Sequence, residues 1–182
     1  MNIPNALSLL RLAAVPFLVL LLHDGHYAAA LVLFVLAGLT DAADGFVAKR
    51  FGQETRLGRV LDPIADKALV VTAYITLGWL GLIPFWLVVA VVSRDLVIVA
   101  GALAYHYLTG ALEMAPSFLS KLNTALQLGL VALVLLEAVL ALGLGEWLGW
   151  LAVAVLATTV ASGLQYVVVW LRKAWAHESP EG

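Results

Sequence analysis

Six apolar runs, separated by short polar or turn-forming stretches, limit most strongly how this chain can fold. They lie near residues 4–23, 27–50, 57–80, 83–109, 117–143 and 147–172. Each run could cross a bilayer as a helix of roughly 20 residues. Composition agrees, because 63% of the 182 residues are apolar and 12% are charged, whereas soluble domains are about half apolar and a quarter charged. The sequence therefore predicts an all-α integral membrane protein, with six transmembrane helices forming one domain over residues 1–182.

The positions of the basic residues predict the orientation of these helices. The first, third and fifth connections, HDGH, GLIP and GLGEW, contain no Lys or Arg. Four basic residues between 49 and 59 flank the second connection, and Arg172 and Lys173 close the last run. By the positive-inside rule, both termini and the second and fourth connections face the cytoplasm. The last residues, about ten of them, would form a cytoplasmic tail.

Four aspartates stand at fixed offsets inside this apolar chain, in the stretch DAADGFVAKRFGQETRLGRVLDPIADK. They are Asp41, Asp44, Asp62 and Asp66. Residues three or four apart share a helix face, so each pair would project together, one near the end of the second run and one near the start of the third. An antiparallel hairpin centred near residue 53 would bring all four carboxylates into one cytoplasm-facing polar cavity.

Converging carboxylates point to a metal site. They cannot all stay ionised without cations, because like charges raise one another's pKa values. Oxygen-only ligand sets suit magnesium, manganese or calcium, and a pair of such ions can clamp phosphates. The alternative is a set of interfacial charges paired with Arg50, Arg56 and Lys67, which leaves the regular spacing unexplained. Pro63 disfavours helical angles in the residue before it, so Asp62 is a candidate N-cap of the third helix.

The acidic stretch resembles the signature of the CDP-alcohol phosphatidyltransferases, D-x-x-D-G-x-x-A-R-x8-G-x-x-x-D-x-x-x-D. Seven of the eight fixed positions agree, and Lys49 stands where the family usually has Arg. Lysine keeps the charge there but lacks the bidentate fork of a guanidinium. The resemblance extends through NIPNALSLLR, SRDLVIVAG and FLSKLNTALQ, and so covers nearly the whole chain.

This resemblance implies that the phosphatidyl group of CDP-diacylglycerol passes to an alcohol, with release of CMP. It implies that the four aspartates hold two divalent ions, Mg²⁺ or Mn²⁺, and that Asp66 also takes the proton from the attacking hydroxyl. The residues that it implies for the nucleotide pocket are Asn5, Arg11, Gly45, Ala48, Lys49, Thr55 and Gly58. For Arg11, a single charge that balances the acidic cluster is the simpler interpretation.

The acceptor alcohol is predicted from Arg94 and Lys121, two cations in the cytoplasmic half of the spans, which favour an acceptor that carries a phosphate. A salt bridge to Asp95 is the alternative for Arg94. Phosphatidylglycerophosphate synthases, which use glycerol 3-phosphate, tend to have G-K-x-K-T at the fifth span. The sequence SKLNT places Asn123 at the second lysine and resembles the S-K-x-N-T of CMP-forming cardiolipin synthases, whose acceptor is phosphatidylglycerol. A phosphodiester carries less charge than a phosphomonoester, so the loss of one cation favours the lipid acceptor.

Other classes of function fit the sequence less well. An intramembrane prenyltransferase usually has more helices, and its acidic motifs lie far apart in sequence. A divalent-cation transporter would need polar residues through both halves of the membrane, and Glu137 is the main one in the outer half. A structural scaffold leaves the converging acids unexplained. No cysteine occurs, which excludes thiol chemistry. No nucleic-acid partner is expected. Small residues such as Gly38 and Ala42 would allow a homodimer.

Overall fold

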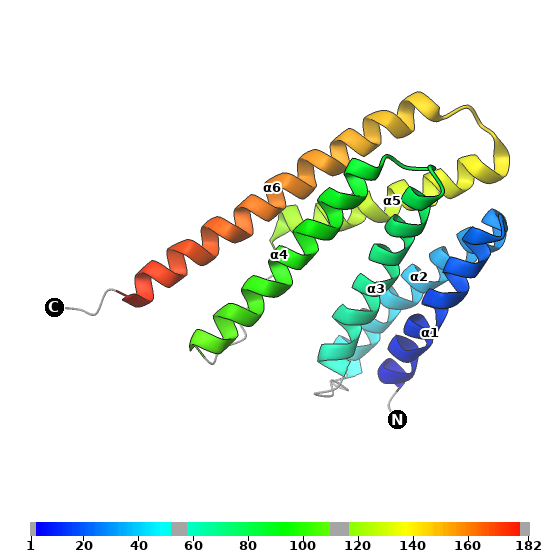
Figure 1. The fold of residues 1–182 in the computed structure, drawn as a ribbon. Helices are drawn as coiled ribbons and strands as arrows, with labels where there is room; N and C mark the ends of the chain where they lie inside the picture. Colours follow the sequence, from blue (N-terminus) through cyan, green and yellow to red (C-terminus); the bar gives the residue numbers. More distant parts are fainter. Residues whose placement is uncertain (1–2, 52–57, 110–116, 179–182) are drawn as a thin grey trace.

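The chain forms a bundle of helices in a computed structural model (Figure 1). In chain order the helices are α1 (Ile3–His23), α2 (Tyr27–Phe51), α3 (Gly58–Trp79), α4 (Phe85–Thr109), α5 (Phe118–Leu140) and α6 (Gly145–Glu178). The structure describes residues 3–51, 58–109 and 117–178, and the side chains of residues 9–40, 65, 67–101 and 117–169. Within these ranges the chain has no strand, and each predicted apolar run corresponds to one helix.

Two helix boundaries differ from the sequence prediction. Helix α3 begins at Gly58, four residues before Asp62, so the prediction of Asp62 as a candidate N-cap was wrong. The restriction that a proline places on the preceding residue is a bias, and neighbouring helices can satisfy backbone groups that a proline leaves free. Helix α6 continues to Glu178, past the predicted end at residue 172. Lys173, two alanines and Glu178 make up most of this extension, and all three residue types favour helix.

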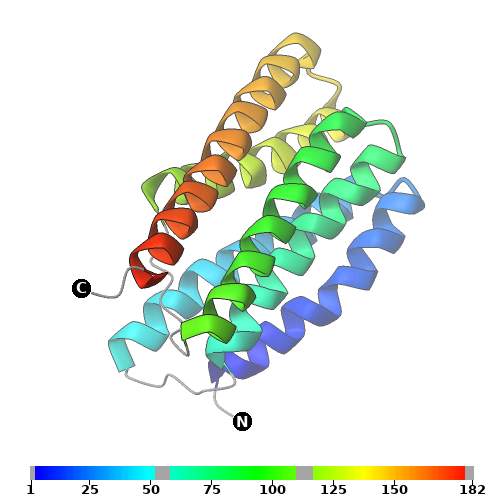
Figure 2. The ribbon, with the colours of Figure 1, turned by 60° about the vertical axis from the view of Figure 1, so that its left-hand side comes forward.

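The helices alternate in direction, which gives the bundle two different ends (Figures 1 and 2). The connections at residues 24–26, 80–84 and 141–144 lie together at one end, called here the loop end. The last turns of α2, α4 and α6 lie at the opposite end, called here the motif end, together with the first turns of α1, α3 and α5. Both ends of the described chain therefore lie on the side where the acidic stretch occurs.

The connection between α5 and α6 is stabilised by Glu137. Its carboxylate oxygens accept hydrogen bonds from the backbone N–H groups of Leu142 and Gly143, each at 3.0 Å. Helix α5 ends at Leu140, and its C-cap Ala141 has a left-handed φ of 49°. The residues that follow lie outside the helix, so their backbone N–H groups need other acceptors. Glu137 thus has a local structural role, and the outer-half carboxylate that a transporter would need is already engaged.

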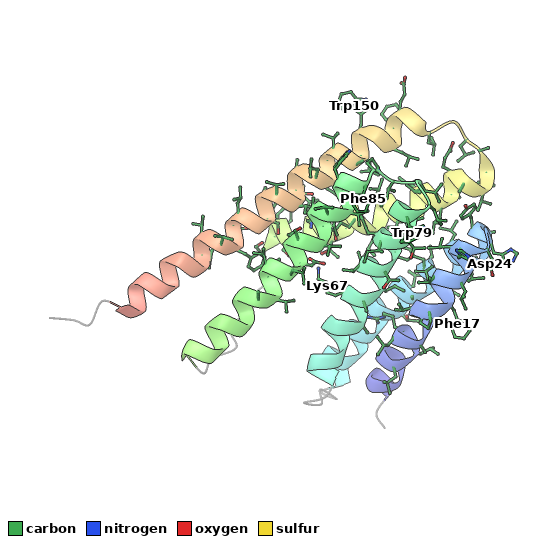
Figure 3. All side chains as sticks on the ribbon, viewed as in Figure 1. Phe17, Asp24, Lys67, Trp79, Phe85 and Trp150 are labelled. Carbon is green, nitrogen blue, oxygen red and sulfur yellow. The ribbon has the colours of Figure 1, made fainter. Side chains whose placement is uncertain are left out.

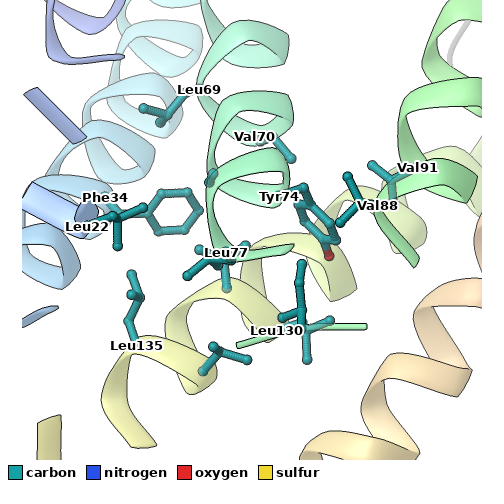
Figure 4. Close-up of a cluster of buried hydrophobic side chains, with 14 of the residues drawn as sticks. Leu22, Phe34, Leu69, Val70, Tyr74, Leu77, Val88, Val91, Leu130 and Leu135 are labelled. Carbon is teal, nitrogen blue, oxygen red and sulfur yellow. The ribbon is translucent and has the colours of Figure 1, made fainter. Parts of the chain in front are cut away.

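An apolar core fills the bundle toward the loop end (Figure 4). Leu22 of α1, Phe34 of α2, Leu77 of α3, Val88 of α4 and Leu135 of α5 are all at most 5% exposed. Among the described residues, helix α3 packs chiefly against α1, and its contacts with α2 are few. In this part of the chain, α2 and α3 are therefore held mainly by other helices.

Two features of the surface fit a bilayer. Among the described residues, Phe118–Leu140 and Gly145–Val169 are long and apolar enough to cross a membrane, and shorter apolar stretches cover Leu9–His23, Tyr27–Thr40 and Lys67–Trp79. Large aromatic side chains near the loop end are exposed, as Figure 3 shows for Trp79, Phe85 and Trp150. Aromatic residues gather where a membrane meets water.

Candidate active site

The acidic stretch lies on two helices at the motif end. Asp41 and Asp44 belong to α2, and Asp62 and Asp66 belong to α3. Their side chains lie outside the described residues, so the predicted convergence of the four carboxylates stays a prediction. The same holds for the side chains of Asn5, Ala48 and Lys49, for the surroundings of Gly45 and Gly58, and for Thr55 altogether. Among the described side chains, no three His, Asp or Glu lie close enough to share a metal ion.

The chemistry of the donor set fits hard divalent cations. Four carboxylates, two on each of two helices that meet the same end of the bundle, offer only oxygen ligands. Nitrogen and sulfur donors, which favour zinc or copper, do not occur in the acidic stretch. Magnesium or manganese held between α2 and α3 is therefore consistent with the residues present.

Three charged side chains form a cluster next to this stretch, the ion cluster of Lys67, Arg94 and Asp95, in which Arg94 and Asp95 are buried and Lys67 is partly exposed. Lys67, which directly follows Asp66, places its Nζ 2.8 Å from Asp95 Oδ1. Arg94 Nη1 donates to the same oxygen at 2.7 Å. The side chains of Arg94 and Asp95 are 4% and 8% exposed. Both cations are therefore paired with the carboxylate of Asp95.

The guanidinium of Arg94 is fixed by two further helices. Its Nη2 donates to Ser120 Oγ of α5 at 2.7 Å and to Ser162 Oγ of α6 at 2.8 Å. Its central carbon lies 5.9 Å from the centroid of the Tyr166 ring. A Cβ on Gly163 would lie 3.5 Å from Arg94 Cγ, an ordinary contact distance, so the Arg94 side chain lies directly against α6 at this point. The predicted salt bridge to Asp95 is thus present, and the phosphate-binding role of Arg94 stays a prediction.

The two α5 residues predicted to bind the acceptor have opposite environments. Lys121 is exposed on the first turn of α5. Asn123 is fully buried, and its Oδ1 accepts hydrogen bonds from the hydroxyls of Thr158, at 2.9 Å, and Thr159, at 2.8 Å. The sequence prediction missed three polar residues of α6, namely Thr158, Thr159 and Ser162. The available signal was their position close together within an apolar part of the helix.

Arg11 lies at a cavity between α1 and α2. The cavity has a volume of about 400 Å³, and its walls are apolar apart from Arg11 and Thr40. Arg11 is 3% exposed, and Thr40 is the residue directly before Asp41. An apolar cavity therefore reaches the beginning of the acidic stretch.

These features define a class of protein: an all-helical, membrane-associated protein with an acidic motif and buried cations at one end of the bundle. Residues 1–160 match the family described as CDP-alcohol phosphatidyltransferase. The chain belongs to this family, and the resemblance drawn from the acidic stretch is confirmed.

The chain is also similar to individual proteins, which carry two different names. The chain is 39% identical over 147 residues to "Cardiolipin synthase (CMP-forming)" of Rattus norvegicus, an alignment that covers 72% of this chain and 49% of the relative. The Homo sapiens protein of the same name is 38% identical over 147 residues, which again cover 72% of this chain and 49% of the relative. A Mycobacterium tuberculosis protein named "Probable phosphatidylglycerophosphate synthase" is 43% identical over 101 residues, covering 52% of this chain and 48% of the relative. The chain thus spans about half the length of these relatives.

Proposed function

We propose that this protein transfers the phosphatidyl group of CDP-diacylglycerol to phosphatidylglycerol, with release of CMP and formation of cardiolipin. The observation that carries the proposal is the family match over residues 1–160, which includes the whole acidic stretch. The cardiolipin-synthase names of two relatives at 38–39% identity support the choice of acceptor.

The proposal includes a membrane arrangement. All six helices cross the bilayer, and both termini, the motif end and a polar cavity face the cytoplasm. Three observations support this arrangement. The helices alternate in direction, basic residues surround the second connection, and aromatic residues near the loop end are exposed. Cytoplasmic CDP-diacylglycerol would then meet the acidic stretch directly.

The reaction assigns separate roles to the residues of the acidic stretch. Asp41, Asp44, Asp62 and Asp66 would hold two divalent cations, Mg²⁺ or Mn²⁺, which offset the negative charge of the diphosphate. Asp66 would take the proton of the acceptor hydroxyl. The hydroxyl oxygen then forms a bond to the phosphatidyl phosphorus, and the bond from that phosphorus to the CMP oxygen breaks, with the electron pair leaving on CMP. The residues proposed to contact the nucleotide are Asn5, Arg11, Gly45, Ala48, Lys49, Thr55 and Gly58.

The acceptor's phosphate would be bound between α4 and α5. Arg94 is held there by Ser120 and Ser162, which leaves its side chain pre-organised. The ion cluster carries two positive charges and one negative charge, and its net positive charge favours an anionic ligand. Exposed Lys121 would meet the phosphate from the solvent side, and neutral Asn123 suits a phosphodiester better than a phosphomonoester.

The test is an assay of the purified protein in detergent with CDP-diacylglycerol and Mg²⁺ or Mn²⁺. Phosphatidylglycerol and glycerol 3-phosphate are supplied in separate reactions, and CMP and the lipid products are measured. We expect cardiolipin from phosphatidylglycerol. Asp66→Asn should reduce turnover by at least about a thousandfold, while Asp24→Asn, an exposed aspartate at the loop end, should leave it unchanged. The absence of CMP with both acceptors would defeat the proposal.

A second candidate function is phosphatidylglycerophosphate synthesis from glycerol 3-phosphate. The 43% identity to the mycobacterial relative over 101 residues favours it. The same assay separates the two, because phosphatidylglycerophosphate would appear only with glycerol 3-phosphate. That outcome would leave the proposed metal site intact and change the acceptor alone.

A further inference from the structure

A line of polar side chains, three of them buried, joins α5 to α6 beside the ion cluster. It consists of Asn123 and Gln127 on α5 and Thr158 and Thr159 on α6, and is called here the amide ladder. Asn123 and Gln127 are completely buried, and Thr159 is 1% exposed. Ser120, which accepts from Arg94, lies three residues before Asn123 and so shares its helix face. The amide ladder is therefore continuous with the site proposed for the acceptor's phosphate.

The hydrogen bonds of the ladder run in one direction. Gln127 Nε2 donates to Thr159 Oγ1 at 3.5 Å, and the Thr159 hydroxyl donates to Asn123 Oδ1 at 2.8 Å. A hydroxyl has one proton to donate, and the structure gives Thr159 this one acceptor. The carbonyl side of the Asn123 amide therefore faces α6, and its amide group is held in one orientation.

Thr158 contributes less to this orientation than Thr159. Its hydroxyl lies 2.9 Å from Asn123 Oδ1, but also 3.0 Å from Ala154 O and 3.1 Å from Val155 O. One proton is thus shared among three acceptors, two of them within its own helix. Thr158 is a matched control for Thr159, because it is a neighbouring threonine that contacts the same Asn123 atom.

The remaining atom of the Asn123 amide is a donor without a partner in the described part of the chain. Nδ2 is buried and has no hydrogen-bond partner among the described residues. At the other end of the ladder, Gln127 Oε1 is likewise a buried acceptor without a described partner. Leaving a buried donor unpaired costs stability, so such groups require an explanation. Asn123 shares a face of α5 with Ser120, which contacts Arg94. A phosphate oxygen bound near Arg94 would accept the hydrogen bond of Nδ2.

From these contacts we infer that Thr159 is a positioning residue, which orients Asn123 so that Nδ2 donates to the phosphodiester of the acceptor lipid. This inference rests on the proposed function, because it concerns the same acceptor site. A neutral donor supplies a hydrogen bond without a second full charge, which matches a ligand carrying one negative charge. Thr159 would thereby contribute to the choice of a phosphodiester over a phosphomonoester.

The test measures kcat and KM for phosphatidylglycerol, and the KM for CDP-diacylglycerol, in detergent with the full chain. Thr159→Val keeps the shape and removes the hydroxyl. We expect it to raise the KM for phosphatidylglycerol about tenfold, the change that follows from losing one well-made hydrogen bond to a charged group. The KM for CDP-diacylglycerol should stay within about twofold, as should all constants of the rescue variant Thr159→Ser and of the control Thr158→Val.

A second variant keeps the inference testable if Thr159→Val does not fold. Asn123→Asp retains an acceptor for both threonine hydroxyls and replaces the Nδ2 donor with an oxygen. It should raise the KM for phosphatidylglycerol more than tenfold, because an ionised carboxylate has no proton to donate and repels a phosphate. An unchanged KM in this variant would overturn the inference.

The outcomes separate this inference from the proposed function. If the wild-type chain makes no cardiolipin from phosphatidylglycerol, the proposed acceptor is wrong and the inference fails with it. If the wild-type chain makes cardiolipin and Thr159→Val lowers only thermal stability, with KM unchanged, Thr159 is a packing residue and the inference alone is overturned. Equal effects of Thr158→Val and Thr159→Val would also overturn it.

Discussion

The loop end and the middle of this bundle are built from different interactions. Toward the loop end, Leu22, Phe34, Leu77 and Leu135 pack together without polar partners. Closer to the motif end, the ion cluster and the amide ladder join α3, α4, α5 and α6 by directional contacts of 2.7–3.5 Å. Apolar packing tolerates local change because its stabilisation is spread over many weak contacts. Each polar contact, in contrast, depends on one particular partner. Stability and chemistry should therefore respond separately to substitutions in the two regions.

The largest effect is expected from Asp95→Asn, because this carboxylate is shared by Lys67 and Arg94. Removing one partner of a buried ion pair costs about 3–5 kcal/mol, and the low end applies here since Asn still accepts a hydrogen bond. Thermal unfolding in detergent measures the loss, and CMP release should fall with it. Asp24→Asn, at the exposed loop end, is the control. Equal unfolding temperatures for the two variants would mean that the ion cluster does not stabilise the fold.

Leu77→Ala tests the apolar region, where the side chain is completely buried. Truncating a buried leucine costs about 2–5 kcal/mol. The low end is expected, because lipid or detergent tails are as apolar as leucine and only the cavity remains costly. Turnover per folded molecule should be unchanged. A large fall in kcat without a fall in unfolding temperature would contradict the separation of the two regions.

Gly78→Ala tests how closely α3 and α4 approach each other at the loop end. A Cβ on Gly78 would lie 2.5 Å from Val88 Cγ2, and Val88 is buried, so we expect a loss of about 1–2 kcal/mol from overpacking. Val88→Ala removes the opposing methyl groups. The double variant should be more stable than the sum of the single variants predicts, and strict additivity would mean that the two residues do not meet.

The smallest effect is expected from Ser162→Ala, which removes one of the two hydroxyls that accept from Arg94 Nη2. Ser120 keeps the guanidinium partly fixed, so the stability loss should be about 1 kcal/mol. The KM for the phosphate-bearing acceptor should rise by a small factor, while the KM for CDP-diacylglycerol stays constant. A larger effect on CDP-diacylglycerol would place Arg94 near the nucleotide donor instead.

Prediction from sequence succeeded where the signal is local. Long apolar runs and short breaks fixed the six helices to within a few residues, because helix formation depends on neighbours along the chain. The acidic stretch was recognisable for the same reason, since its spacing lies within 26 residues and two helices. The third run, near 57–80, agrees with the start of α3 at Gly58. Only the candidate N-cap at Asp62 was wrong, because the effect of Pro63 on its neighbour was given too much weight.

The polar contacts of the middle region could not be predicted, because their partners lie far apart in sequence. Arg94 and Ser162 are 68 residues apart, and Asn123 and Thr159 are 36 residues apart. Nothing in the pattern of α6 indicates which of its polar residues faces α5 and which faces lipid. That choice depends on the rotation of each helix about its axis, which is set by packing against all its neighbours.

The sequence by itself therefore determined that this is a six-helix, largely apolar chain with the acidic motif of its family. Composition, hydrophobic run length and motif spacing are properties of the chain alone, and the physics of lipid and of like charges acts on them directly. Only the tertiary structure decided that Asp95 joins Lys67 to Arg94 and that Thr159 holds Asn123. Those pairings exist because buried polar groups must find partners, and the folded bundle alone brings those partners within hydrogen-bonding distance.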